Sequence, residues 1–180
     1  MHFIAALYKF STISNPEILQ VEIRKKLKEM SIYGTILVGK EGLNGTISGN
    51  NKDIKSAVYF IKSISGFSDL DIKYSKSGIN PFIRLKVKLK KEIVTIGDES
   101  IDPNKIVGNY IEPEDWNELI NDENTILIDT RNNYECSIGS FKNAINPNTL
   151  KFRDFPKWVD KQNFSDEEKK EKKFAMFCTG

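Results

Sequence analysis

Two short apolar runs in the second half of this chain end in residues that could do chemistry. The run at residues 174–177 ends at Cys178, which a small residue and a glycine follow, and the run at residues 126–128 ends at Asp129 and Arg131. A strand that ends in cysteine and opens into a glycine-containing loop can present a thiolate to a cup of backbone N–H groups, which lowers the pKa of the thiol. Cys178 is therefore the candidate reactive residue. Because the sequence stops two residues later, we expect its chemistry to need further residues.

The segments around these residues have the pattern of an open α/β sheet. Residues 126–128 form a continuous apolar run, as expected of a central parallel strand that is covered on both faces. Asp129 and Arg131 follow at its carboxyl end, where ligands bind in sheets of this kind. The other predicted segments are a helix from Pro113, strands at 143–146 and 174–177, a helix at 155–159 and a solvated connection at 167–173.

The first half of the chain predicts a ferredoxin-like α+β domain over residues 1–96, with elements in the order βαββαβ. Asn15 and Pro16 have the order of a helix N-cap and first helical residue, and apolar residues follow at spacings of three and four. Either Asn51 or Asp53 is expected to cap the second helix. The four strands are predicted at residues 2–10, 33–38, 46–48 and 70–74.

A glycine-rich connection at residues 39–45 joins the second and third strands as a hairpin. Its glycines suggest a phosphate cradle, but no GKS or GKT sequence follows at the P-loop spacing, so hairpin turn chemistry is the better interpretation. Glu41 and Asn44 are polar residues on this connection and could line a site. We do not expect either to be catalytic.

The clearest pattern of a binding surface lies in residues 82–91. Four cations, Arg84, Lys86, Lys88 and Lys90, alternate with four aliphatic residues, so a strand here would have one cationic and one aliphatic face. No acidic residue occurs between Asp71 and Glu92. The pattern fits a surface that binds the phosphates of RNA, and it also fits the solvated outer face of an edge strand whose lysines block aggregation. Both interpretations stay open at this point.

The composition argues against a disordered, a membrane-spanning and a zinc-binding protein. The chain has 180 residues, of which 39% are hydrophobic and 29% charged, as in globular proteins. No apolar run approaches the roughly 20 residues of a membrane helix, and two cysteines with one histidine argue against a zinc site. No leader precedes the first apolar residues, so a cytoplasmic location with reduced thiols is expected. Residues 1–100 contain 16 Lys+Arg and 10 Asp+Glu, whereas residues 101–180 contain 11 and 15, which suggests two units with the basic one facing an anion.

Several segments together resemble a known family. Residues 129–147 look like the opening signature of a rhodanese domain, and residues 176–180 look like the start of its active-site loop. With residues 42–49, 82–88 and 91–97 added, the whole chain resembles the bacterial rhodanese-related tRNA uridine hydroxylases. The resemblance implies a first domain at 1–96, a linker at 97–112 and an incomplete rhodanese domain at 113–180.

The resemblance also implies an activity. Members of this family carry out oxygen-dependent 5-hydroxylation of the wobble uridine of tRNA, so molecular oxygen is the implied co-substrate and tRNA the implied partner. Cys178 matches the loop cysteine, a persulfide-type active-site residue, and Asp129 and Arg131 match a structural ion pair. No flavin or metal motif shows how oxygen would be activated. The chain alone, without the rest of the loop, is expected to be inactive.

The chain departs from the family pattern at two positions, and other functions remain open. Rhodaneses generally carry an aromatic residue and a histidine where this chain has Cys136 and Ser140. Cys136 is therefore interpreted as a core residue rather than a reactive thiol. The alternatives are a sulfurtransferase that acts on a small sulfane-sulfur donor and a non-catalytic RNA-binding module. The basic strand discriminates between them, because a small donor needs no long row of cations.

Overall fold

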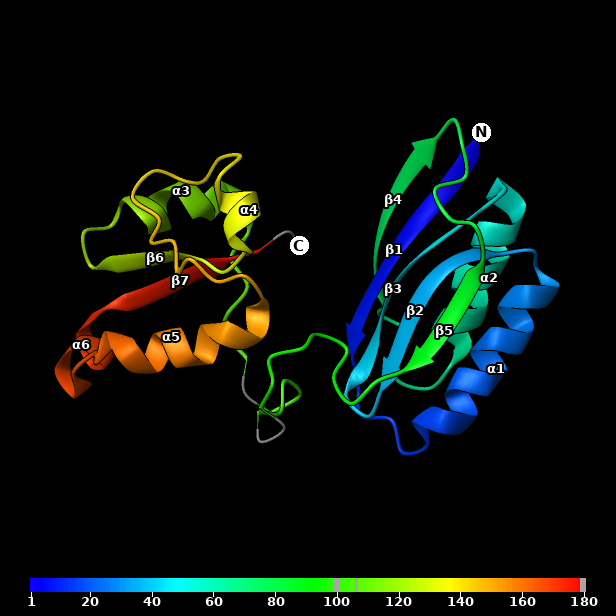
Figure 1. Ribbon diagram of the computed structural model, residues 1–180, viewed down its shortest axis with the longest axis horizontal. Coiled ribbons are helices and arrows are strands. Elements are labelled where there is room, and N and C mark those ends of the chain that lie inside the picture. Colours follow the sequence, from blue (N-terminus) through cyan, green and yellow to red (C-terminus); the bar gives the residue numbers. More distant parts are fainter. Residues whose placement is uncertain (99–100, 106, 179–180) are drawn as a thin grey trace. The chain divides into compact units, whose positions relative to one another are not determined.

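The computed structural model of this chain describes residues 1–98, 101–105 and 107–178. The chain divides into two compact units, one over residues 1–94 with part of the segment that follows, and the other over residues 95–98 and from 108 onward. Each unit has a sheet of its own (Figure 1). The segment predicted as a linker, residues 97–112, contributes residues to both units.

The N-terminal unit is a five-stranded sheet in the order β4-β1-β3-β2-β5, with its two helices on one face (Figure 1). Strand β1 pairs antiparallel with β3 and β4, β2 pairs antiparallel with β3, and β5 pairs parallel with β2. This arrangement confirms the predicted ferredoxin-like α+β fold and adds β5 as a fifth strand at the edge. The elements are β1 (His2–Phe10), α1 (Pro16–Glu29), β2 (Tyr33–Gly39), β3 (Gly42–Gly49), α2 (Asn51–Ser63), β4 (Asp71–Ser77) and β5 (Leu85–Leu89).

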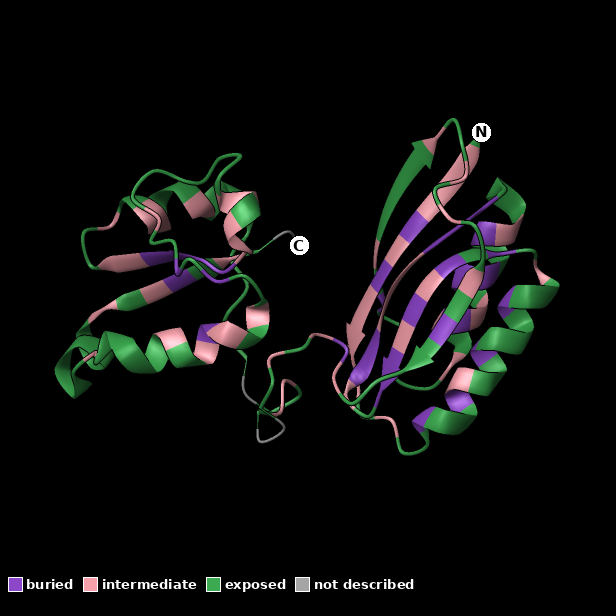
Figure 2. Cartoon of the chain, viewed as in Figure 1, coloured by how far each residue is buried: buried purple, intermediate pink, exposed green. Residues whose placement is uncertain are grey.

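Both helices bury one apolar face against the sheet (Figure 2). Helix α1 begins at Pro16 as predicted, and its residues Leu19, Ile23 and Leu27, spaced by four, are buried. The cap of α2 was predicted at Asn51 or Asp53, one or three residues too late. Asn50 is the N-cap, and its side-chain oxygen accepts a hydrogen bond of 2.8 Å from the backbone N–H of Asp53. The helices cover one face of the sheet and leave the row of cations on β5 outside the core.

The hairpin between β2 and β3 is tighter than predicted. Gly39 pairs directly with Gly42, so residues 42–45 belong to β3 rather than to a loop. Gly42 has a φ of 150°, and a Cβ atom there would lie 2.1 Å from the carbonyl oxygen of Lys9 on the neighbouring strand. The glycine therefore permits close strand pairing and is not part of a phosphate cradle.

The second unit pairs two parallel strands, with Asp129 of β6 opposite Phe177 of β7. The predicted strand at 143–146 is a single bridge, because only Ile145 pairs with Ile128. Asn143 and Asn148 adopt positive φ angles of 65° and 55°, and these turn the chain away from the sheet on either side. The elements are α3 (Pro113–Asn121), β6 (Thr125–Asp129), α4 (Asn133–Cys136), a 3-10 helix η1 (Phe152–Asp154), α5 (Phe155–Gln162), α6 (Asp166–Glu171) and β7 (Lys173–Phe177).

One predicted connection is a helix. Residues 166–171 form α6, where a solvated connection was expected. Ser165 and Glu168 make a reciprocal cap: the Ser165 hydroxyl accepts from the Glu168 N–H at 3.1 Å, and the Glu168 carboxylate accepts from the Ser165 N–H at 2.9 Å. This capping box supplies the start signal that the lysine-rich composition hides. Within the described parts of the chain, no helix is long and apolar enough to span a bilayer.

Candidate nucleic-acid interface and thiol site

The cationic row lies on the edge strand β5. Lys86 and Lys88 belong to the strand, and Arg84 and Lys90 flank it; all four residues are exposed. Val87 packs into the core on the face covered by the helices, so the cations that alternate with it lie on the opposite, exposed face of the sheet. The predicted residues therefore do lie together along one edge of the N-terminal unit.

The aliphatic half of the predicted pattern is only partly right. Val87 is buried and Leu85 is half-buried against the helices, but Ile83 is 96% exposed and Leu89 is 46% exposed. The strand is shorter than residues 82–91, and its pairing with β2 runs from Leu85 opposite Gly34 to Leu89 opposite Val38. Bends at residues 83 and 84 lie before the paired segment and leave Ile83 outside the apolar face.

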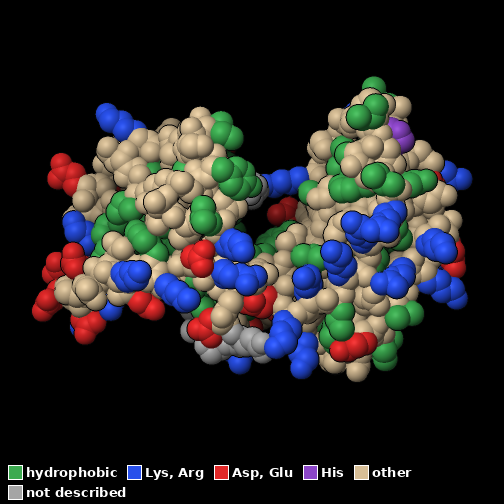
Figure 3. All heavy atoms as spheres, viewed as in Figure 1, with side chains coloured by type: hydrophobic (Ala, Val, Ile, Leu, Met, Phe, Trp, Pro, Cys, Tyr) green, Lys and Arg blue, Asp and Glu red, His purple; other side chains and the backbone are tan. Residues whose placement is uncertain are grey.

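The cations of this row are not neutralised by neighbours. Within the described part of the chain, none of Arg84, Lys86, Lys88 or Lys90 has a carboxylate within ion-pair distance. Figure 3 shows Lys and Arg side chains gathered over this face of the N-terminal unit. Unpaired like charges raise the local positive potential, so the edge attracts anions.

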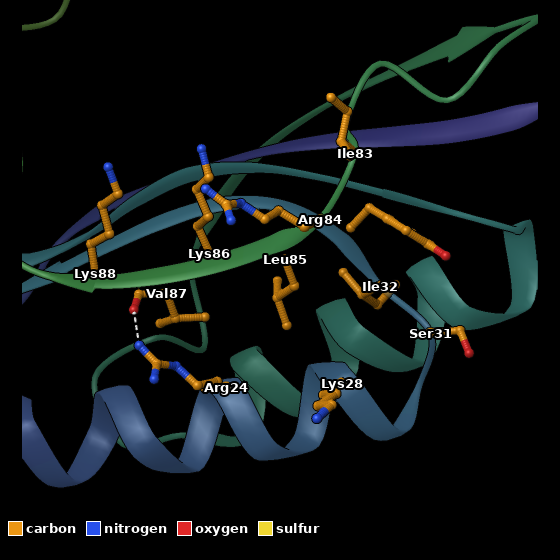
Figure 4. Close-up of a pocket in the computed structure, with 11 residues that line it drawn as sticks. Arg24, Lys28, Ser31, Ile32, Ile83, Arg84, Leu85, Lys86, Val87 and Lys88 are labelled. Carbon is orange, nitrogen blue, oxygen red and sulfur yellow. Dashed lines mark hydrogen bonds between the residues drawn. The ribbon is translucent and has the colours of Figure 1, made fainter.

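A groove of about 810 Å³ runs between β5 and the second half of α1. Figure 4 shows Arg84, Lys86 and Lys88 pointing away from α1, while Arg24 reaches from the helix to the strand and Lys28 lies on the helix with its amine directed away from β5. Cations thus lie on both sides of the edge strand. The lining residues are Arg24, Lys28, Ser31, Ile32, Tyr33, Ile83, Arg84, Leu85, Lys86, Val87 and Lys88, none of them acidic.

Helix α1 also covers the open edge of β5. Gln20 Nε2 and Arg24 Nη2 both donate to the carbonyl oxygen of Val87, at 2.6 and 2.8 Å. A bare edge strand invites pairing with another strand, and these side chains cap its central carbonyl. Sequence reasoning missed Arg24, Lys28 and Tyr33, because only the fold brings α1 and β2 beside β5.

Glu41 and Asn44 hold the chain that follows β5. The Glu41 carboxylate accepts a 2.6 Å hydrogen bond from the backbone N–H of Ile93, and Asn44 Nδ2 donates to the Ile93 carbonyl at 3.0 Å. Ile93 is buried. These bonds give both polar residues structural contacts and fix the end of the basic segment against the β2–β3 hairpin.

In the second unit, Asp129 and Arg131 form a two-point ion pair at the carboxyl end of β6. Arg131 Nε and Nη2 donate to the two carboxylate oxygens at 2.9 and 2.6 Å, and the Ser140 hydroxyl donates to one of them at 2.7 Å. Asp129 is completely buried. Hydrogen bonds from the Arg131 guanidinium hold the pKa of the Asp129 carboxyl well below its usual range, although burial opposes the shift.

The backbone just before Cys178 is fixed by β6. The Thr130 N–H and hydroxyl both donate to the Phe177 carbonyl, at 3.0 and 2.8 Å. The Phe177 ring packs edge-on against Phe141, with 4.9 Å between the ring centroids. Cys178 follows at the end of β7 and is exposed. The predicted opening of a glycine-containing loop, residues 179–180, lies outside the described residues.

Cys136 has a different environment. It is half-buried at the end of α4, and its thiol donates a long contact of 3.8 Å to the Arg131 carbonyl. Burial and the neighbouring Asp129 carboxylate raise the pKa of the Cys136 thiol. A raised pKa disfavours the reactive thiolate. In the described ranges, no group of three or more His, Cys, Asp or Glu side chains could hold a metal ion.

Comparison with known proteins identifies relatives of the whole chain. It is 51% identical over 177 residues to a protein named tRNA uridine(34) hydroxylase from Bartonella quintana (strain Toulouse), and 49% identical to the protein of that name from Bartonella bacilliformis. Both alignments cover 98% of this chain, which spans 58% and 57% of those relatives. An acylphosphatase structure from Coxiella burnetii aligns at 11% identity over 48% of this chain and 90% of that one, with a TM-score of 0.34. Residues 2–93 match the model of the UPF0176 acylphosphatase-like domain, and the chain belongs to that family.

Proposed function

We propose that this chain is part of an enzyme that hydroxylates the wobble uridine of tRNA, with the edge strand β5 as its RNA-binding surface. The observation that carries the proposal is the row of Arg84, Lys86, Lys88 and Lys90, which is exposed and has no acidic partner among the described residues. The name shared by relatives about half identical to this chain supplies the substrate. A substrate of this kind favours a cytoplasmic location.

The geometry of β5 suits a phosphate backbone. Lys86 and Lys88 are same-face neighbours in a strand, about 6.6–6.8 Å apart along it, which is close to the distance between successive phosphates of an extended nucleic-acid strand. Arg24 and Lys28 add positive charge from the helix side of the same groove. A small anionic sulfur donor would need no such row.

Cys178 is the proposed reactive residue of the second unit, which we interpret as the first part of a rhodanese domain. Its exposed position directly after β7 lies at the carboxyl edge of two parallel strands, where α/β sheets bind ligands. Asp129 and Arg131 are proposed as structural supports, because they bind each other. The Asp129 carboxylate also accepts a hydrogen bond from Ser140, and the Arg131 guanidinium also donates one to the Gly139 carbonyl.

The reaction implied by the family is 5-hydroxylation with molecular oxygen as co-substrate. One oxygen atom enters the C5–H bond of uridine, and two electrons from a reductant with two protons convert the other atom to water. The part that this chain contributes is RNA binding at β5 and, as proposed, the thiol of Cys178.

The test is complementation of a strain that lacks the gene, followed by mass spectrometry of the nucleosides in its tRNA. The wild-type gene should restore 5-hydroxyuridine, whereas Cys178→Ser should not. Cys136→Ala serves as the matched cysteine control and should retain the modification. Full modification with Cys178→Ser would refute the role of this thiol, and unmodified tRNA in the wild-type complement would refute the function.

A further inference from the structure

The groove beside β5 has an apolar end as well as its cations. Tyr33 and Ile83 line it together with Arg84 and Lys86. The exposed fractions are 40% for Tyr33 and 96% for Ile83, so large apolar surfaces face solvent there. Binding of phosphates alone does not use apolar side chains, whereas a ligand that also has a flat, apolar part could contact this end of the groove.

Tyr33 lies on the same face of the sheet as the lysines. Thr35 of β2 pairs with Lys86 of β5, and Tyr33 precedes Thr35 by two residues, so its side chain points to the same side as that of Lys86. The two Cα positions are about 8 Å apart from strand spacing and rise. Among the described residues, no hydrogen bond or ring contact involves the Tyr33 side chain. The ring is available to a ligand.

We propose that Tyr33 stacks on an unpaired base of the RNA strand whose phosphates lie on Arg84, Lys86 and Lys88. A base stacked on Tyr33 would place its own phosphate within about one nucleotide of Lys86, because the Cα atoms of the two residues are about 8 Å apart. The five cations of the groove, with no acid in its lining, complement a polyanion. Aromatic rings beside a cationic track are the usual means by which proteins hold single-stranded RNA.

This inference rests on the proposed function and makes it more specific. A double helix keeps its bases stacked and paired, so it could reach the lysines but not cover Tyr33 with a base. The groove should therefore prefer an unpaired segment, such as the loop that carries a wobble uridine, over a duplex of equal charge.

The test measures binding of the 180-residue chain to an anticodon stem-loop RNA and to a fully paired duplex with the same number of phosphates. Tyr33→Ala should weaken stem-loop binding about 5- to 150-fold, as expected for the loss of one base–aromatic stack, and leave duplex binding unchanged. Tyr33→Phe should retain stem-loop affinity. The matched control is Tyr59→Ala, a change at a 78% exposed tyrosine on α2, which should affect neither RNA.

The outcomes separate this inference from the proposed function. If Lys86→Ala with Lys88→Ala weakens binding of both RNAs while Tyr33→Ala changes neither, the phosphate site stands and the stacking role is wrong. If none of these substitutions changes the affinity for either RNA, both proposals fail. That result is also the one expected if the groove binds a protein partner instead of RNA.

A measurement on the unaltered chain guards against misfolding of the variant. RNA with 5-bromouridine in its loop should form a light-induced crosslink to the peptide that contains Tyr33. Crosslinks found only outside the groove would overturn the inference.

Discussion

The guanidinium of Arg131 lies over the ring of Phe177, with its central carbon 5.5 Å from the ring centroid. The same guanidinium binds the buried carboxylate of Asp129, so one side chain connects the end of β6 to the residue that precedes Cys178. A cation over an aromatic face is stabilising, and here the cation is oriented by its carboxylate. The ion pair thus supports the strand end from which the exposed thiol projects.

Replacement of Asp129 by Asn tests how much this ion pair stabilises the second unit. The change keeps the shape of the side chain and removes the charge that accepts bonds from Arg131 and Ser140. We expect the free energy of unfolding of the second unit to fall by about 1.5–3 kcal/mol, the usual contribution of hydrogen bonds to a charged group. Urea denaturation followed by tryptophan fluorescence measures the change.

The matched control for this replacement is Asp166→Asn. It removes the exposed partner of Lys169, whose ion pair spans 3.6 Å, and should alter stability little. Equal losses of unfolding free energy in the two variants would show that the buried pair stabilises the chain no more than an exposed pair does.

The stability that Asp129 provides should depend on pH. Because its folded pKa lies below the ordinary value of about 3.9, the unfolded chain binds this proton at a higher pH than the folded chain does. The contribution is therefore complete above about pH 5 and is lost as the pH falls below about 4. The difference in unfolding free energy between wild type and Asp129→Asn should be constant from about pH 8 to about pH 5 and shrink below that. A difference that grows toward low pH contradicts the assignment.

Charge reversal on β5 should weaken tRNA binding and its salt dependence together. Lys86→Glu with Lys88→Glu removes two proposed phosphate-binding cations, so the slope of log affinity against log salt should fall by about 0.7 to 0.9 for each phosphate that the variant no longer neutralises. Filter binding at several salt concentrations measures both quantities. Lys52→Glu with Lys55→Glu on α2 makes the same change in net charge away from the groove. Unchanged tRNA affinity at low salt in the β5 variant would exclude this edge as the binding surface.

The sequence predicted the N-terminal fold well because each element carries a local signal. The apolar spacing in α1, the glycine-rich hairpin and the alternation around Val87 all concern residues close in the chain. The signals that failed depend on partners far away. Ile83 lies in a bend before the segment that pairs with β2, and nothing within residues 82–91 shows where that pairing begins.

For the candidate groove, too, only the residues with a local signal could be predicted. Arg84, Lys86 and Lys88 were predicted from alternation, whereas Arg24 and Tyr33 become neighbours of β5 only when β5 pairs parallel to β2 beside α1. The cap at Ser165 is a different case. Its spacing to Glu168 is a local start signal that the sequence does contain, and the run of lysines that follows obscured it.

The two cysteines should differ in reactivity, and that difference tests the choice of Cys178. Cys136 is half-buried, and burial with the Asp129 carboxylate raises the pKa of its thiol, so little thiolate is present at neutral pH. Cys178 is exposed at the end of β7. We expect iodoacetamide at about pH 7.5 to modify Cys178 several-fold faster than Cys136, as measured by mass spectrometry of peptides over time.

Cys178→Ser should leave one slow site, and Cys136→Ala should leave one fast site. Denaturation in urea should bring the two rates together, because it removes the burial and the carboxylate that protect Cys136. Faster modification of Cys136 in the folded chain would show that the reactive thiol has been assigned to the wrong residue.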